Sequence, residues 1–204
     1  MALVDFIPVV LFTAAAIILQ RAFYNKMSKG AFALFATGTI DVIFAGGLKA
    51  VYKLLYALNI CDFEPLSNMF FPVQSIGFLL AGIGLLAAVC HRQGKGAAFA
   101  VVPPVLWKGT FLFVGLMVAG LGLVDVVLSI FAVKLKKPLL IILFVLSFVF
   151  SLGMGYLSTK NFAQASMNWI AEFVNILGQG SLLLGAVLLK KAGLTEFGVP
   201  KENA

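Results

Sequence analysis

The sequence predicts an all-α, polytopic integral membrane protein whose helices pack as a bundle in a lipid bilayer. Of its 204 residues, 62% are hydrophobic and only 11% are charged, whereas a soluble globular domain is typically about 45–50% apolar and about 25% charged. The apolar residues form long unbroken runs, and an α-helix needs about 20 such residues to span the hydrocarbon layer. The basic residues lie between these runs, as expected for side chains that reach lipid head groups.

Six apolar runs are long enough to cross the membrane. In chain order they cover residues 3–20, 31–48, 69–90, 110–133, 139–157 and 169–189. The second run is expected to continue as a helix through Lys49, Lys53 and Tyr56. We therefore expect a single transmembrane domain over residues 1–194, followed by a short solvated tail over residues 195–204.

Residues 97–107 raise the question of a seventh crossing. This segment is apolar but has only eleven residues and contains Pro103 and Pro104, so it is too short for an ordinary helical span. With six spans, seven of the fifteen Lys and Arg residues lie on one side of the membrane and eight on the other. If residues 97–107 also cross, eleven lie on one side and four on the other. The larger group is then Arg21, Lys26, Lys29, Arg92, Lys95, Lys134, Lys136, Lys137, Lys190, Lys191 and Lys201. The smaller group is Lys49, Lys53, Lys108 and Lys160.

The positive-inside rule favours the unequal division. It therefore favours seven crossings, with the N-terminus outside and the C-terminus in the cytoplasm. Two alternatives remain open: a re-entrant segment, which is tolerated only where protein or water covers its backbone, and a dual-topology protein with balanced charge.

Two predicted spans share a spacing of polar and small residues. In each, an amide is followed by a glycine three residues later and a second glycine ten residues later. The two sets are Gln74, Gly77 and Gly84, and Asn175, Gly178 and Gly185. A three-helix internal repeat with halves 1–92 and 108–192 would produce this pattern. The alternative is a chance match, because glycine and leucine are frequent in any membrane helix.

A layout of three helices, one linking helix and three helices resembles the architecture of the sugar-transporter and PQ-loop group. Their proline–glutamine pair is absent here, because Val73 separates Pro72 from Gln74. The resemblance is therefore architectural, and it assigns no site residue.

The last predicted span carries a stripe of polar residues. Asn168, Glu172, Asn175 and Gln179 are spaced by four, three and four residues, which places them on one face of a helix. Such a stripe would bind a small solute, a cation or a proton. The alternative is that the amides only join packed helices, at about 0.6–2 kcal/mol each.

Four other intramembrane polar residues are candidate ligand-binding groups. Asp41 lies near the middle of the second span with Thr37 one turn earlier, and a charged Asp there costs about 2.5–3.5 kcal/mol unless it meets a partner, water or a proton. Gln74 begins a stripe of small residues on the third span. Asp125 is a secondary candidate, because it shares a face with Gly115, Gly122 and Ser129, which first indicates close packing.

The sequence offers little support for metal, cofactor or nucleophilic chemistry. His91 is the only histidine, and Cys61 and Cys90 follow no metal-binding spacing. No nucleophile–base pair is visible, so we expect no cofactor, no metal and no catalytic residue. Nucleic-acid binding is also not expected, because it needs a solvated basic face.

The sequence thus favours a small transporter or permease of the plasma membrane. Its partners would be the lipid bilayer and a small solute or ion, with coupling to protons or cations through intramembrane carboxylates. A homo-oligomer or a partner membrane subunit is also compatible with the sequence. Three alternatives stay open: a non-catalytic subunit, either the substrate-binding component of a larger importer or a sensory or assembly partner; an intramembrane enzyme that modifies lipids; and a channel.

Overall fold

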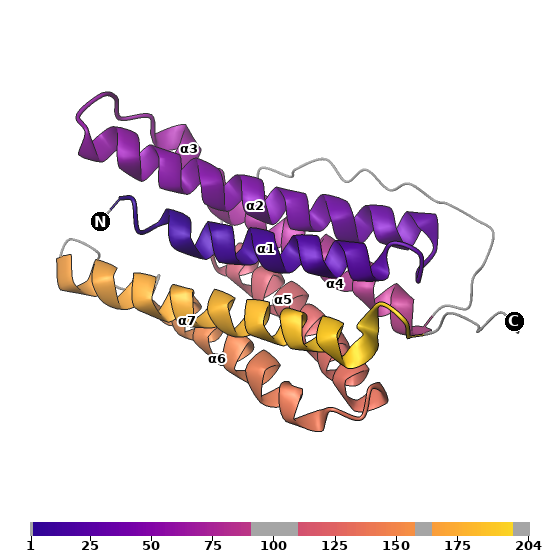
Figure 1. The fold of residues 1–204 in the computed structure, drawn as a ribbon. Helices are drawn as coiled ribbons and strands as arrows, with labels where there is room; N and C mark the ends of the chain where they lie inside the picture. The colour runs from indigo at the N-terminus through magenta and orange to yellow at the C-terminus, as the bar shows by residue number, and fades with distance from the viewer. Residues whose placement is uncertain (1, 91–109, 158–164, 198–204) are drawn as a thin grey trace, which may run out of the picture.

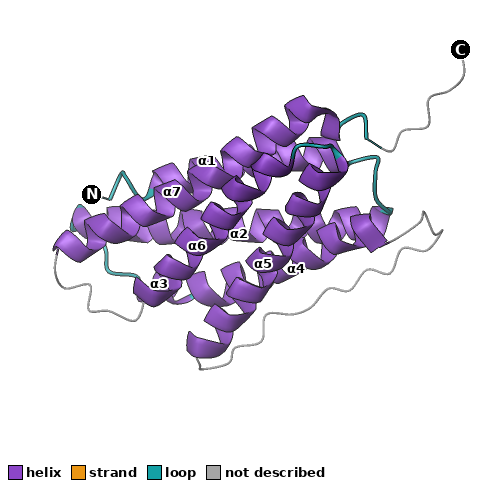
Figure 2. Cartoon of the chain, turned by 90° about the horizontal axis from the view of Figure 1, so that it is seen from below, coloured by secondary structure: helices purple, strands orange, loops and turns teal. Residues whose placement is uncertain are grey.

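A computed structural model of the chain describes residues 2–90, 110–157 and 165–197. The long helices are α1 (Phe6–Phe23), α2 (Lys29–Ala57), α4 (Phe70–Cys90), α5 (Thr110–Lys134), α6 (Ile141–Leu157) and α7 (Ala165–Leu189). The short ones are α3 (Glu64–Asn68), η1 (Pro138–Leu140) and η2 (Lys190–Leu194). Within the described ranges, six helical segments are long and apolar enough to cross a membrane. The expected all-α bundle with six spans is therefore confirmed, whereas residues 97–107 lie outside the described part of the chain (Figures 1 and 2).

Local sequence signals set several helix ends. The Ser28 side chain caps α2 by accepting a hydrogen bond of 3.2 Å from the backbone N–H of Ala31. Asn59 follows α2 with a φ of 54°, a left-handed conformation that asparagine tolerates better than most residues. Lys136 takes a similar conformation after α5, with a φ of 57°, and Pro138 then begins η1. The connection between α5 and α6 is consequently tight.

The six long helices form a closed ring. Each packs against two neighbours, in the order α1, α2, α4, α5, α6, α7 and back to α1. Glycines allow the closest approaches: a Cβ at Gly38 of α2 would lie 2.4 Å from the backbone oxygen of Gly77 on α4. A Cβ at Gly120 of α5 would lie 2.4 Å from the backbone nitrogen of Leu79 on α4. Backbone contact therefore joins α2, α4 and α5, as small residues do in membrane helix pairs.

The helices α4 and α5 run parallel, because Gly82 of α4 meets Gly120 and Leu123 of α5 while Phe78 of α4 also meets Gly120. Elsewhere in the ring the pairs α1–α2, α2–α4, α5–α6 and α6–α7 are antiparallel. The end of α4 and the start of α5 therefore lie at opposite ends of the ring, as do the start of α1 and the end of α7.

Charge divides the two ends of the ring. We call "the acidic end" the one that holds the starts of α1, α4, α5 and α7; its described charged residues are Asp5, Lys49, Lys53, Asp62, Glu64 and Glu172. We call the opposite one "the basic end". Its described charged residues are Arg21, Lys26, Lys29, Lys134, Lys136, Lys137, Lys190, Lys191 and Glu196.

Aromatic and aliphatic side chains fill the ring at the basic end. The phenyl group of Phe23 makes edge contacts with those of Phe35 and Phe131, at centroid distances of 6.2 and 5.1 Å. Phe131 also meets Phe197 at 6.1 Å, so the beginning of the segment after residue 195 packs on the bundle. Lys26 donates hydrogen bonds to the backbone carbonyls of Leu194 and Phe197, which joins the α1–α2 connection to the end of η2.

Candidate functional site

The ring is hollow toward its acidic end. A cavity of about 310 Å³ lies between the helices there, and all six long helices contribute lining side chains. Its polar and charged lining residues are Asp5, Lys49, Lys53, Gln74, Ser151, Glu172, Asn175 and Gln179. The volume is at the lower end of the range typical of ligand pockets, roughly 300–1,000 Å³.

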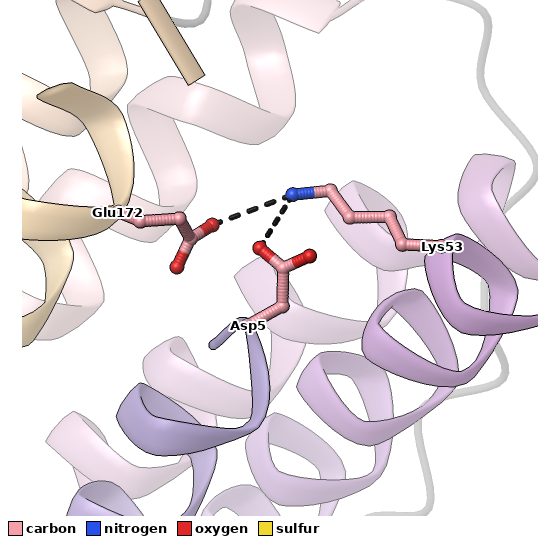
Figure 3. A network of polar contacts seen from close by, with 3 residues as sticks. All are labelled: Asp5, Lys53 and Glu172. Atoms are coloured by element: carbon pink, nitrogen blue, oxygen red, sulfur yellow. Dashed lines mark hydrogen bonds and ion pairs between the residues drawn. The ribbon is translucent and has the colours of Figure 1, made fainter. Parts of the chain in front are cut away.

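Three charged side chains meet at the cavity: Lys53 from α2, Glu172 from α7, and Asp5, which immediately precedes α1 (Figure 3). The ammonium nitrogen of Lys53 lies 2.7 Å from Asp5 Oδ1 and 3.3 Å from Glu172 Oε1. The side chains of Asp5 and Glu172 are only 6% and 10% exposed, and that of Lys53 is 31% exposed. One ammonium therefore neutralises two largely buried carboxylates, and it ties the start of α1 and the second turn of α7 to the end of α2.

Lys49 is the fourth charged group of the cavity and has a different environment. Its ammonium lies 3.8 Å from the ring centroid of Phe70 and 5.7 Å from that of Phe71. Among the described residues, the salt bridges within 4.0 Å involve Lys53 and not Lys49. The aromatic face stabilises the cation, but Lys49 has no carboxylate in direct contact in the described part of the chain.

Amide side chains extend the polar lining beyond the charged groups. Gln74 comes from α4, and Asn175 and Gln179 come from α7. Gln179 lies fourteen residues beyond the start of α7, about 21 Å along the axis at 1.5 Å per residue. The polar lining therefore extends well into the bundle rather than stopping at its mouth.

Several buried acceptor atoms of the lining residues lack a hydrogen-bond donor. Within the described residues these include Gln74 Oε1, Glu172 Oε2 and Gln179 Oε1. An unsatisfied buried acceptor costs about 1–3 kcal/mol, and most buried polar atoms in folded proteins are paired. Three such atoms among the lining residues of one cavity indicate a site that a hydrogen-bond donor would complete.

Apolar side chains form the inner walls. Phe12 of α1 and Phe78 of α4 pack edge to face, with centroids 5.6 Å apart, and both line the cavity together with Met117 and Leu121 of α5. Phe12 and Phe78 are almost fully buried. They separate the cavity from the filled core at the basic end.

The structure brings four of the seven predicted ligand-binding residues together. Gln74, Glu172, Asn175 and Gln179 all line the cavity, so the predicted stripe on the last span faces it along most of its length. Asn168, one turn before Glu172, is not among the lining residues.

The remaining predicted residues lie elsewhere. Asp41 is half-buried and its Cβ faces Gly77 on α4, and Thr37 is exposed on the outer surface of α2. Neither lines the cavity. The secondary candidate Asp125 is buried in α5 beside the Ser147 hydroxyl of α6, also away from the cavity.

Sequence reasoning missed Asp5, Lys49, Lys53 and Ser151 as site residues. The two lysines appeared as the polar extension of a span, and Asp5 and Ser151 lay within predicted spans without being proposed as site residues. A usable signal was present: Lys49 and Lys53 are four residues apart within one continuous helix, which places two cations on one face close to the membrane.

No known protein family, curated protein sequence or solved structure matches the chain. Among the described residues, no cluster of three or more His, Cys, Asp or Glu side chains is arranged to hold a metal ion.

Proposed function

We propose that this membrane protein is a small transporter or permease that binds a small polar solute or ion in the cavity of its helix ring. One observation carries the proposal: a cavity of about 310 Å³ lies between six helices, and its lining combines two ammonium groups, two carboxylates and unpaired amide oxygens. Intramembrane ionisable groups that face a cavity typically mark a solute or ion pathway.

The distribution of charge supports an orientation for this transporter. The basic end has eight described Lys and Arg residues, and the acidic end has two. By the positive-inside rule the basic end faces the cytoplasm. In that orientation the cavity lies toward the outer side of the membrane and the filled aromatic core lies toward the cytoplasmic side.

The order of the helices supports a mechanism of alternating access. The set α1, α2 and α4 and the set α5, α6 and α7 have the same sequence of directions around the ring. Gln74 and Asn175, the amides of the proposed repeat, both line the cavity. We propose that the two sets are repeats whose relative rotation exposes the cavity to each side in turn.

A test of transport uses purified protein in liposomes. Uptake of radiolabelled leucine, 4-methylpentanoate, isoamylamine and glucose would be compared with uptake into protein-free liposomes and into liposomes that carry the Glu172→Gln variant. We expect protein-dependent uptake of at least one solute and a reduction of about tenfold in the variant, because the substitution removes one of the carboxylates that orders Lys53. Absence of uptake for all four solutes would contradict the proposal.

One feature favours a second candidate, an enzyme that modifies lipids. Lys53 lies four residues from the end of α2, and Asp5 precedes α1, so this acid–base cluster lies close to head-group depth. Incubation with mixed phospholipids followed by mass spectrometry separates the two candidates. New lipid products that disappear in Glu172→Gln would favour the enzyme, whereas unchanged lipids with solute uptake would favour the transporter.

A further inference from the structure

The four charged groups of the cavity are not equally satisfied. Lys53 contacts both carboxylates, Asp5 and Glu172, whereas in the described part of the chain no carboxylate lies within 4.0 Å of the Lys49 ammonium, which faces the ring of Phe70 at 3.8 Å. The formal charges of the four groups cancel, but the contacts leave one cation without an anion. An ammonium has three donors, and a ring face accepts them only weakly compared with a carboxylate.

We infer that the ligand of this cavity is a small carboxylate with an apolar body, and that its anionic group pairs with the ammonium of Lys49. The inference rests on the proposed function, because it names the class of solute that the same cavity binds. It assigns to Lys49 the role of the anion-binding residue.

A ligand that is only a cation fits the cavity less well. Such a ligand would have to share both carboxylates with Lys53, whose ammonium already contacts Asp5 Oδ1 and Glu172 Oε1. It would also add a third positive charge beside Lys49 and Lys53 with no further carboxylate to balance it. A carboxylate ligand instead supplies the contact that Lys49 lacks.

The remaining polar lining matches the donor groups of such a ligand. The unpaired oxygens Gln74 Oε1, Gln179 Oε1 and Glu172 Oε2 are acceptors, so an ammonium or hydroxyl group on the acid would satisfy one or more of them after small side-chain rotations. Amino acids and hydroxy acids therefore belong to the expected class, together with simple acids.

The size and walls of the cavity define the apolar part of the ligand. A volume of about 310 Å³ corresponds to about ten water molecules at roughly 30 Å³ each. Phe12, Phe78, Met117 and Leu121 form the inner wall. A branched body of a few carbon atoms fits this space, whereas the full chain of a long fatty acid does not.

A binding experiment on the full chain in detergent tests the ligand class. Isothermal titration with 4-methylpentanoate, leucine, isoamylamine and 4-methylpentanamide compares ligands that share one apolar body and differ in the polar group. We expect 4-methylpentanoate and leucine to bind, and the amine and the amide to bind at least about tenfold more weakly. Equal or tighter binding of isoamylamine or of the amide would overturn the assignment.

Variants of Lys49 test the residue. Lys49→Met should weaken binding of 4-methylpentanoate by about tenfold or more, and Lys49→Arg should restore most of it because the charge is kept. The matched control is Lys190→Met, which removes an exposed lysine at the basic end and should leave binding unchanged. Thermal unfolding of each variant shows that it is folded, and unchanged binding in a folded Lys49→Met protein would refute the role.

Palmitate distinguishes a small acid from a lipid-derived one. We expect it to bind more weakly than 4-methylpentanoate, and tighter binding that depends on Lys49 would overturn the small-acid class. The failure of this inference is distinguishable from the failure of transport. Binding that depends on Lys49 without liposome uptake would defeat transport alone, whereas uptake of glucose without uptake or binding of the acids would defeat the ligand class alone.

Discussion

The two ends of the helix ring are built from the same six helices, yet one is filled and the other is hollow. At the basic end, Phe23, Phe35 and Phe131 meet edge to face, and Leu128 and Leu189 are fully buried. At the acidic end, the corresponding space is a cavity of about 310 Å³ with charged groups and amides in its lining.

The difference shows how sequence decides where a membrane bundle stays open. Large apolar side chains close the interior because they pack without needing partners. Charged groups keep an interior open because each must reach a counter-ion, a donor or water. In this chain the interior changes from hollow to filled at Phe12 and Phe78, which belong to both the wall of the cavity and the packed core.

The largest difference in stability is expected between two glycine substitutions, one at the close-packed basic end and one where the added methyl group meets open space. Gly84→Ala at the basic end would place a Cβ 2.6 Å from the backbone nitrogen of Phe35 and 2.7 Å from the backbone oxygen of Ala31. We expect it to lower the free energy of unfolding by about 3 kcal/mol. Gly47→Ala on α2 is the control, because nothing lies within 4 Å of its added Cβ, and it should be neutral or stabilising. Thermal unfolding in detergent measures both, and equal effects would contradict the close packing described for the basic end.

A smaller effect is expected from removing the ammonium that holds the acidic end together. Lys53→Met leaves Asp5 and Glu172 without their shared counter-ion, and we expect a loss of about 2 kcal/mol, less than for a fully buried pair because Lys53 is partly exposed. The double variant Lys53→Met/Glu172→Gln removes one of the stranded charges and should recover part of the loss. If chemical unfolding shows no difference between the single and double variants, the three groups are not energetically coupled.

The smallest effect is expected from filling the cavity. Ser151→Leu adds volume where the cavity has room, so its cost should be about 0.5 kcal/mol, mainly for the lost hydrogen bond to the Ser147 carbonyl. Ser147→Leu, one turn earlier and only 2% exposed, should cost about 1 kcal/mol more through overpacking. Ser151→Leu should also abolish ligand binding. If titration shows normal binding in that variant, the ligand lies elsewhere.

The fold was largely predictable because hydrophobic length is a local property. Each of the six apolar runs could be identified from its own residues, and each became a long helix. The ring order and the parallel pair α4–α5 were not predictable in the same way, since they depend on contacts between distant glycines such as Gly82 and Gly120.

The site was most predictable where one helix carried several of its residues, although Gln74 was also predicted from a helix of its own. Glu172, Asn175 and Gln179 formed a visible stripe, and the structure places all three at the cavity. Asp5 contributes a single residue before α1, and its role depends on the approach of Lys53 from α2 at 2.7 Å. Asp41 shows the converse case: a carboxylate in the middle of a span indicated a site, but its Cβ faces the glycine of a neighbouring helix.

The proposed halves meet at two seams, where α4 packs on α5 and where α1 packs on α7. Different groups hold the two seams together. The α4–α5 seam is closed by backbone contacts around Gly82 and Gly120, which cannot separate without exposing main-chain surface. The α1–α7 seam is bridged by side chains: Lys53 links Asp5 to Glu172 at one end, and Lys26 holds the carbonyls of Leu194 and Phe197 at the other. Side-chain links can exchange partners with water or solute without exposing main-chain surface, so in the proposed rotation the first seam would act as a hinge and the second as the edge that parts.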